Sequence, residues 1–180
     1  MELFTRAKIP KNHWGCTLAQ IPETAKHYPK IKEYLDNIVE NVKSGKGMYF
    51  SNQPGRGKSG TAAIVAKCAI AHRFSVLWIE SEKTVKYAIE KEQFDEDQTI
   101  YQRAESCDLL IMDEFFVDSK PRPCERYLEI LLRTRIDAGK STILTSNISP
   151  TALKTRYPLL YSVLTEVTEF IDFDAKVNFR

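Results

Sequence analysis

The segment NQPGRGKSGT, residues 52–61, contains residue types that can bind phosphate. It follows the short apolar stretch GMYFS and precedes a segment that is apolar nearly throughout, so it joins a predicted strand to a predicted helix. Backbone N–H groups at the start of a helix can surround a phosphate. We therefore predict that the phosphates of a nucleotide are bound by Asn52, Pro54, Gly55, Arg56, Gly57, Lys58, Ser59, Gly60 and Thr61.

Two loop residues have specific predicted roles. Lys58 would reach the β- and γ-phosphates, and Ser59 would place its hydroxyl on Mg²⁺. Asn52 stands where the pattern G-x-x-x-x-G-K-[ST] has its first glycine. Because asparagine adopts positive φ more readily than most residues, we expect the loop to keep its shape and to bind ATP or ADP with Mg²⁺.

Polar residues also follow two later apolar stretches. DLLIMDE ends in Asp113 and Glu114, where Asp113 suits a Mg²⁺-holding role and Glu114 could orient or deprotonate an attacking water. TILTSN ends in Asn147, whose amide could contact both the γ-phosphate and that water. With Lys58, these three residues form the predicted catalytic set of an ATPase.

The surrounding pattern alternates between strands and helices. Helices are predicted over 31–42, 57–72 and 124–139 and from Ser149 with Pro150, and two more short ones between Ser81 and Ser106, around the acidic stretch EKEQFDEDQ. Short apolar strands between helices indicate an α/β fold in which a five-stranded parallel sheet is covered on both faces. The predicted strands are 47–51, 75–80, 108–114, 141–147 and 169–173.

Length and composition suit one folded domain. The chain has 180 residues, of which 43% are hydrophobic and 28% charged, and its net charge is +2. We expect a single domain over 1–180, in which 1–45 form an N-terminal segment and a helix that leads into the core. No run of roughly 18 apolar residues could span a bilayer, so we expect no membrane association and a cytoplasmic location, the host cytoplasm if a phage encodes the chain.

The cysteines and histidines carry no recognisable chemistry. The cysteines lack the close spacing of a zinc site or a redox motif, so we expect reduced, mostly buried thiols. No histidine has a neighbouring ligand or nucleophile at a useful spacing, which favours structural roles. These residues are Cys16, Cys68, Cys107, Cys124, His13, His27 and His72.

Taken together, IPKNHWGCTL, GMYFSNQPGRGKSGTAA, LLIMDE and TILTSNISPTAL resemble the AAA+ ATPases that load bacterial and phage replicative helicases, and their relatives that assist insertion-sequence transposition. The resemblance implies a P-loop NTPase of the AAA+ type, a three-layer sandwich without a separate C-terminal lid domain. It also implies that the fourth strand lies between the first and third, which would put Asn147 between Lys58 and Asp113. The segment from Ile9 to Leu18 would pack by the adenine.

Two departures from the family pattern affect the expected activity. Aligned without gaps, the family's arginine-finger positions fall on Leu159 and Val163, neither of which can stabilise phosphate charge, so we expect slow hydrolysis. Arg156 could substitute after a shift in register, and Arg133, Arg135 and Arg180 are further candidates, although we expect each of them to lie on the surface. The chain also begins close to the ATPase core, so helicase contacts would come from 1–30, from 90–97 or from another protein.

Contacts with DNA are predicted less specifically. In the family, single-stranded DNA runs along a helical ring of subunits, and a homo-oligomer is therefore one of our expectations. Lys83 and Lys86 lie three residues apart with Tyr87 beside them, a combination that suits phosphate contacts and base stacking. An ordinary solvated lysine face explains the pattern equally well. A second basic strip could be formed by Lys43, Lys46, Arg133 and Lys140.

Four functions are compatible with these motifs. The first is an ATPase that loads or remodels a replicative helicase, or another replication protein, on DNA. The second is a transposition helper that marks target DNA, and the third is a nucleotide-gated module that binds a host replication protein and scarcely hydrolyses ATP. A kinase of a small metabolite ranks last, because no acceptor pocket or lid arginines are evident.

Overall fold

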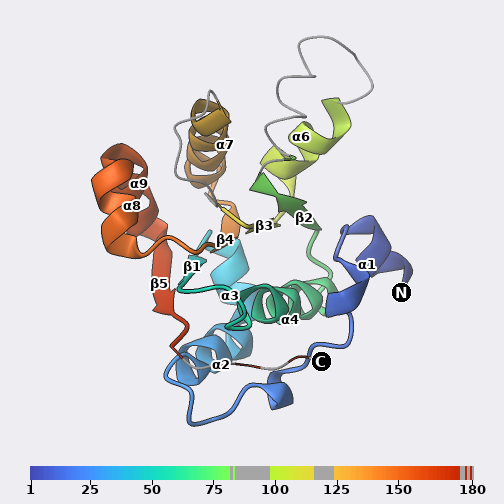
Figure 1. Ribbon diagram of the computed structural model, residues 1–180. Coiled ribbons are helices and arrows are strands. Elements are labelled where there is room, and N and C mark those ends of the chain that lie inside the picture. The colour runs from blue at the N-terminus through green and yellow to red at the C-terminus, as the bar shows by residue number, and fades with distance from the viewer. Residues whose placement is uncertain (82, 84–97, 116–123, 175–176, 178, 180) are drawn as a thin grey trace.

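The computed structural model of the protein describes residues 1–81, 83, 98–115, 124–174, 177 and 179, and the side chains of 98, 99 and 124–126 are outside that description. Its centre is a five-stranded parallel sheet in the order β2-β3-β4-β1-β5 (Figure 1). The predicted strands and the position of the fourth strand between the first and third are thus confirmed. The strands are β1 Gly47–Ser51, β2 Val76–Glu80, β3 Leu109–Asp113, β4 Ser141–Thr145 and β5 Thr168–Asp172.

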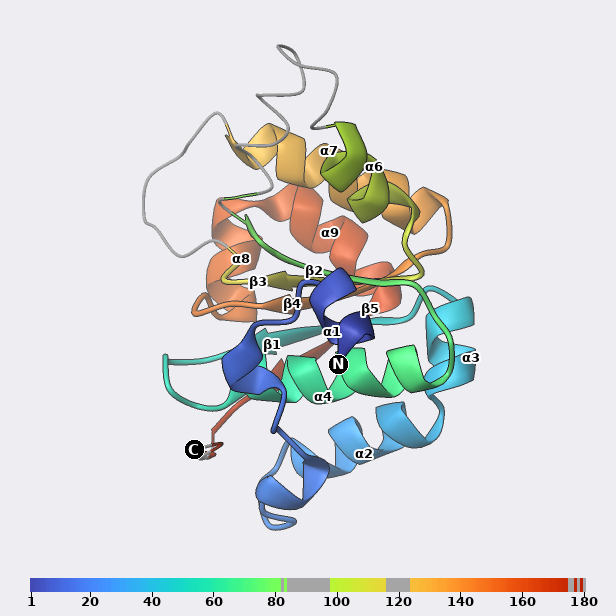
Figure 2. The same cartoon turned by 90° about the vertical axis from the view of Figure 1, so that its right-hand side faces the viewer.

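Helices cover both faces of this sheet. In Figure 2, α4 and α2 lie below the strands, and α6, α7 and α9 lie above them. Short 3₁₀ turns occupy Lys11–His13 (η1) and Leu18–Gln20 (η2). The helices are α1 Glu2–Arg6, α2 Tyr28–Asp36, α3 Ile38–Lys43, α4 Lys58–Ala71, α6 Gln98–Ser106, α7 Cys124–Asp137, α8 Pro150–Arg156 and α9 Pro158–Val167.

The alternation of side chains along each strand divides the core in two. In β1, Met48 and Phe50 pack with α4 in one cluster, while Tyr49 packs in the other cluster with apolar residues of α7 and α9. The strands β1 to β4 are therefore buried on both faces over nearly their whole length, whereas β5, at the edge of the sheet, is mostly half-buried. The three-layer α/β sandwich predicted from sequence is confirmed.

The helix predicted over 31–42 is in fact two helices, α2 and α3, which meet at Asn37. Asn37 leaves helical geometry at φ −112° and ψ 26°, and its side-chain amide donates to the carbonyl of Glu33 at 3.0 Å. The side-chain amide of Asn41 donates to the carbonyl of Tyr34 at 3.1 Å. These side-chain bonds satisfy carbonyls near the break, so the helix can end without leaving buried acceptors unpaired.

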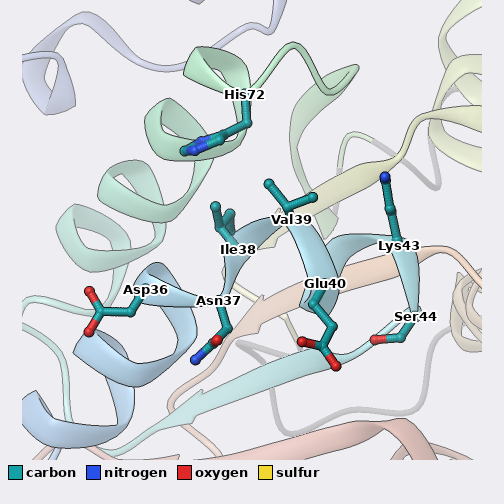
Figure 3. A pocket seen from close by; sticks show the side chains of 8 residues that line it. All are labelled: Asp36, Asn37, Ile38, Val39, Glu40, Lys43, Ser44 and His72. Atoms are coloured by element: carbon teal, nitrogen blue, oxygen red, sulfur yellow. The ribbon is translucent and has the colours of Figure 1, made fainter.

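The apolar positions of this region are buried as their spacing predicted, including Ile31, Tyr34, Ile38 and Val42. A broad surface hollow of about 650 Å³ lies at the break between the two helices, beside the end of α4 (Figure 3). It is lined by Asp36, Asn37, Ile38, Val39, Glu40, Lys43, Ser44 and His72.

The remaining element predictions hold where the structure describes them. Ser149 caps α8, since its hydroxyl accepts a hydrogen bond from the N–H of Ala152 at 3.2 Å. Of the short helices predicted between Ser81 and Ser106, α6 is present and residues 84–97 are outside the described residues. Cys16, Cys68 and Cys107 are free thiols, two buried and one half-buried, whereas the side chain of Cys124 is outside the described set. None of the helices in the described part of the chain has the length and apolar composition needed to cross a bilayer.

Arg135 was expected on the surface, and this prediction is wrong: its side chain is completely buried. Its guanidinium donates to the carbonyls of Ala104 and Cys107 at 2.6 and 3.0 Å, to the carbonyl of Ser141, and to the Thr142 hydroxyl at 2.9 Å. The carbonyl end of α6 carries partial negative charge, which stabilises a buried cation. Arg135 thus ties α6, α7 and the start of β4 together. Burial lowers its pKa.

We predict that Arg135→Ala lowers the free energy of unfolding by about 3 kcal/mol, because several buried carbonyl oxygens lose a charged donor. Urea unfolding followed by circular dichroism measures the change. Arg133→Ala is the matched control on α7, since the Arg133 side chain is 42% exposed and pairs with the partly exposed Glu129 at 3.0 Å. Its effect should stay below about 0.5 kcal/mol. Equal effects of the two variants would contradict the structural role of Arg135.

Candidate nucleotide-binding site

The loop of residues 52–57 joins the end of β1 to the first residue of α4, as predicted. Asn52 has φ +112°, and Gly55 and Gly57 have φ +75° and +89°. The Asn52 carbonyl oxygen Oδ1 accepts a hydrogen bond from the N–H of Gln53 at 2.6 Å, and Nδ2 donates to Asp172 Oδ1 at 2.7 Å. The positive φ expected of Asn52 is confirmed. Its amide gives the loop an anchor to the end of β5 that glycine could not provide.

Lys58 connects the loop to the tip of β4. Its ammonium group donates to the carbonyls of Asn52 and Gln53 at 2.5 and 2.9 Å and to Asn147 Oδ1 at 2.9 Å. Only 7% of the residue's surface is exposed. Burial lowers the pKa of Lys58 to about 8, with Asp113 raising it and Arg56 lowering it to smaller extents. The structure thus brings Lys58 and Asn147 into direct contact.

Asp113 is a shared acceptor at the end of β3. Its Oδ1 accepts hydrogen bonds from the Ser59 hydroxyl at 2.9 Å and from the Thr145 hydroxyl. Carboxylate and hydroxyl oxygens are hard ligands, and Mg²⁺ is commonly held by one or two protein oxygens together with phosphates and waters. Among the described residues, no group of three or more acidic, histidine or cysteine side chains forms a metal cage. Ser59 and Asp113 therefore fit a magnesium ion that arrives with a nucleotide.

Glu114 follows in a constrained backbone conformation. Its φ is +55°, which is unusual for a residue with a long side chain. Its N–H donates to the Thr145 hydroxyl at 3.1 Å, and its carbonyl accepts from the Ser81 hydroxyl at 2.7 Å. These two bonds hold the turn, and the side chain of Glu114 is exposed at the candidate site.

A cavity of about 610 Å³ lies over these elements and includes most of the predicted residues. Asn52 and Asp113 do not line it and join the site through hydrogen bonds. Thr61 is fully buried, and its hydroxyl has no hydrogen-bond partner among the described residues. The lining consists of Asn12, His13, Pro54, Gly55, Arg56, Gly57, Lys58, Ser59, Gly60, Glu114, Thr145, Ser146, Asn147, Val177 and Phe179.

Six lining residues were not predicted to belong to the site, and two of them, Thr145 and Ser146, directly precede Asn147 in the sequence. Asn12 and His13 lie in the segment that the resemblance places by the adenine, but His13 itself had been given a structural role. Its ring centroid lies 5.8 Å from that of Trp78, and burial lowers its pKa while Asp113 raises it. Val177 and Phe179 follow β5 and belong to no motif, so no sequence signal connected them with the loop.

The other predicted functional residues that the structure describes do not line this cavity. Leu159, at the first finger position, is 68% exposed, Val163 is half-buried and Arg156 is exposed. Lys83 pairs with Glu80 at 2.8 Å. Lys86 and residues 90–97 are outside the described residues, so the predicted contacts with DNA remain predictions. In the second basic strip, Lys140 pairs with Asp108 at 2.9 Å.

No protein-family model matches the chain, and no curated protein matches it. Solved structures do. The crystal structure of the DnaC helicase loader aligns with a TM-score of 0.78 at 18% identity over 91% of this chain and 99% of that one. DnaI aligns with a TM-score of 0.77 at 15% identity over 91% and 93%. AMPPCP-bound DnaA from Aquifex aeolicus aligns with a TM-score of 0.73 at 18% identity over 93% of this chain and 53% of that one, so the chain spans about half of the DnaA structure.

These identities are low, so the likeness concerns the fold. The strand order, with β4 between β1 and β3, and the position of the loop between β1 and α4 agree with the fold that the sequence resemblance implies. The chain has the fold of the DnaC helicase loader, of DnaI and of the aligned part of DnaA.

Proposed function

We propose that the protein is an ATP-binding AAA+ ATPase of slow turnover that loads or remodels a replicative helicase on DNA. The observation that supports the proposal is that the carboxyl ends of β1, β3 and β4 lie together around Lys58 and Ser59. Lys58 contacts Asn147 after β4, and the neighbouring Ser59 contacts Asp113 at the end of β3. A positive charge, a carboxylate and an amide are thereby gathered above one phosphate-binding loop, as phosphoryl transfer requires.

Each residue of this group has a role in hydrolysis. The Lys58 ammonium would neutralise charge on the β- and γ-phosphates, and Asn147 would hydrogen-bond the γ-phosphate together with the attacking water. Glu114 would orient or deprotonate that water. Ser59 and Asp113 would hold Mg²⁺, which neutralises charge on the phosphates when bound. Release of the γ-phosphate would then change the partners of Lys58 and Asn147.

Slow turnover follows from the surface of α9. The finger positions carry Leu159 and Val163, and neither side chain offers a hydrogen-bond donor to a phosphate. An arginine at such a position contributes about 10³- to 10⁵-fold to phosphoryl transfer in well-studied switches. Nucleotide state therefore serves mainly as a conformational signal.

The assignment to replication rests on the fold. The aligned structures are the DnaC helicase loader, DnaI and AMPPCP-bound DnaA. We extend this role to the present chain, with a replicative helicase or another replication protein as partner, single-stranded DNA as a further ligand and a homo-oligomer as the assembly.

One observation favours a second candidate, a nucleotide-gated module that binds a replication protein with little hydrolysis. Leu159 is one of the exposed large hydrophobic residues of the described chain, and it occupies the position where an arginine would serve catalysis. An exposed leucine at that place suits contact with a protein better than contact with phosphate.

We predict that Lys58→Ala weakens ATP binding by about ten- to hundredfold, because a charge-assisted contact with phosphate contributes about 1.5–3 kcal/mol. Isothermal titration calorimetry with Mg²⁺ and ATP measures the dissociation constant. Lys43→Ala, which removes an exposed lysine of α3, should leave it unchanged. Wild-type protein that takes up no ATP would refute the proposed function.

The affinity for ATP should depend on pH through Lys58. Its pKa is about 8 in this structure, and nearby phosphate would raise it, so binding favours the protonated amine. Affinity is then full below pH 8 and falls as the pH rises above it, by up to about tenfold per pH unit. Calorimetry between about pH 7 and pH 9.5 in two buffers of different ionisation enthalpy detects the accompanying proton uptake. A flat profile without proton uptake would show that Lys58 does not bind phosphate as an ammonium ion.

Glu114→Gln should retain ATP binding and lose hydrolysis, because an amide cannot accept the proton of the attacking water. A phosphate-release assay compares it with wild type, whose turnover alone should be slow. With ATP present, the variant should retain a replicative helicase in a pull-down from cell extract. Fast turnover of isolated wild-type protein would contradict the signalling role, and phosphate transfer to a small acceptor would favour the kinase alternative.

A further inference from the structure

The segment that follows β5 runs along the phosphate-binding loop. Asp172 accepts the Asn52 amide at 2.7 Å, and the carbonyl of Asp174 accepts from Arg56 Nη1 at 3.1 Å. Two residues at opposite ends of the loop are therefore tied to this later segment.

Val177 and Phe179 continue these contacts onto the first turn of α4. A Cβ atom added to Gly57 would lie 2.8 Å from Val177 Cβ and 3.0 Å from Phe179 Cε2. One added to Gly60 would lie 2.3 Å from Phe179 Cδ2 and 2.5 Å from Phe179 Cε2. The phenyl ring thus lies directly against the Gly60 backbone, in space that a Cβ would occupy, so glycine at this position makes the contact possible.

Phe179 lies on the side of the cavity toward which the ribose and base of a bound nucleotide would extend. The γ-phosphate end is defined by Lys58 and its contact with Asn147. The ribose and base must therefore leave toward the rest of the first turn of α4, where Gly60 lies. Val177 and Phe179 lie against this turn and line the cavity, and Asn12 and His13, from the segment that the resemblance places by the adenine, line it as well.

The cavity of about 610 Å³ exists with the Phe179 ring in place, so the ring lines the space rather than filling it. This volume is in the range of small-molecule sites, which combine apolar walls with a few polar groups. Val177 is 5% exposed, whereas Phe179 is half-buried and lines the cavity. An aromatic ring in the wall beside the expected path of a nucleotide is suited to stack on a base.

We infer that Phe179 is a base-binding residue: its ring forms the wall of the nucleobase subsite and contributes to affinity for a nucleoside triphosphate, not for triphosphate alone. The inference rests on the proposed function, because it assigns the part of the same ligand that the loop does not hold. It also gives a role to Gly60, whose missing side chain lets the ring reach the helix.

Calorimetry with MgATP and with magnesium tripolyphosphate tests this inference, because the second ligand has the phosphates without a base. Phe179→Ala should weaken binding of MgATP by about tenfold, within the range found for loss of base stacking, and change tripolyphosphate affinity less than about twofold. Phe179→Tyr, which keeps the aromatic face, should restore MgATP binding. Phe179→Leu, which keeps only apolar bulk, should not.

Other results would overturn the inference. Unchanged MgATP affinity in Phe179→Ala would show that the ring does not touch the base, and tighter binding would show that it blocks the cavity. Equal weakening for both ligands would mean that Phe179 acts through the shape of the loop. Circular dichroism of each variant verifies folding, and wild-type protein that binds neither ligand would refute the proposed function itself, a result distinct from all of these.

Discussion

The geometry of the candidate site depends on one shared carboxylate. Asp113 accepts hydroxyl hydrogen bonds from Ser59 at the start of α4 and from Thr145 at the end of β4. Thr145 accepts in turn from the N–H of Glu114, which holds the positive φ of that residue. This chain of bonds requires β4 to lie beside β3, so the strand order and the local chemistry specify each other.

The same arrangement explains why a lysine is tolerated where it is almost completely buried. Removing an ammonium group from water is unfavourable unless acceptors replace the lost hydration. Lys58 has three oxygen acceptors, two of them loop carbonyls, yet its pKa still falls to about 8. The site therefore holds a cation whose charge is incompletely compensated by the protein. A phosphate group would supply the missing negative charge, which links the cost of burial to ligand binding.

Local sequence patterns predicted the parts of the structure that depend on local chemistry. The loop, the acids after β3 and the amide after β4 could all be placed, because apolar strands and turn residues mark where parallel strands end. Sequence patterns did not predict the features that depend on the hydrogen bonds of a few individual side chains. The apolar spacing of 31–42 continues through Asn37, so periodicity could not reveal a break made by asparagine side chains. Arg135 could not be recognised as buried, because two of its carbonyl acceptors, on Ala104 and Cys107, lie 31 and 28 residues earlier in the sequence.

Phe179 belongs to the same class of unpredictable contacts, and it joins the far end of the chain to the loop motif. The contact between Lys58 and Asn147 also lies close in sequence to α8 and α9. Asn147 lies two residues before Ser149, whose hydroxyl caps α8, and α9 with its exposed Leu159 follows at once. If nucleotide phosphates compete with Asn147 for Lys58, the tip of β4 changes its partners at the point where α8 begins. A signal to a bound protein would then need no arginine finger, because the two-state element is the Lys58–Asn147 contact itself.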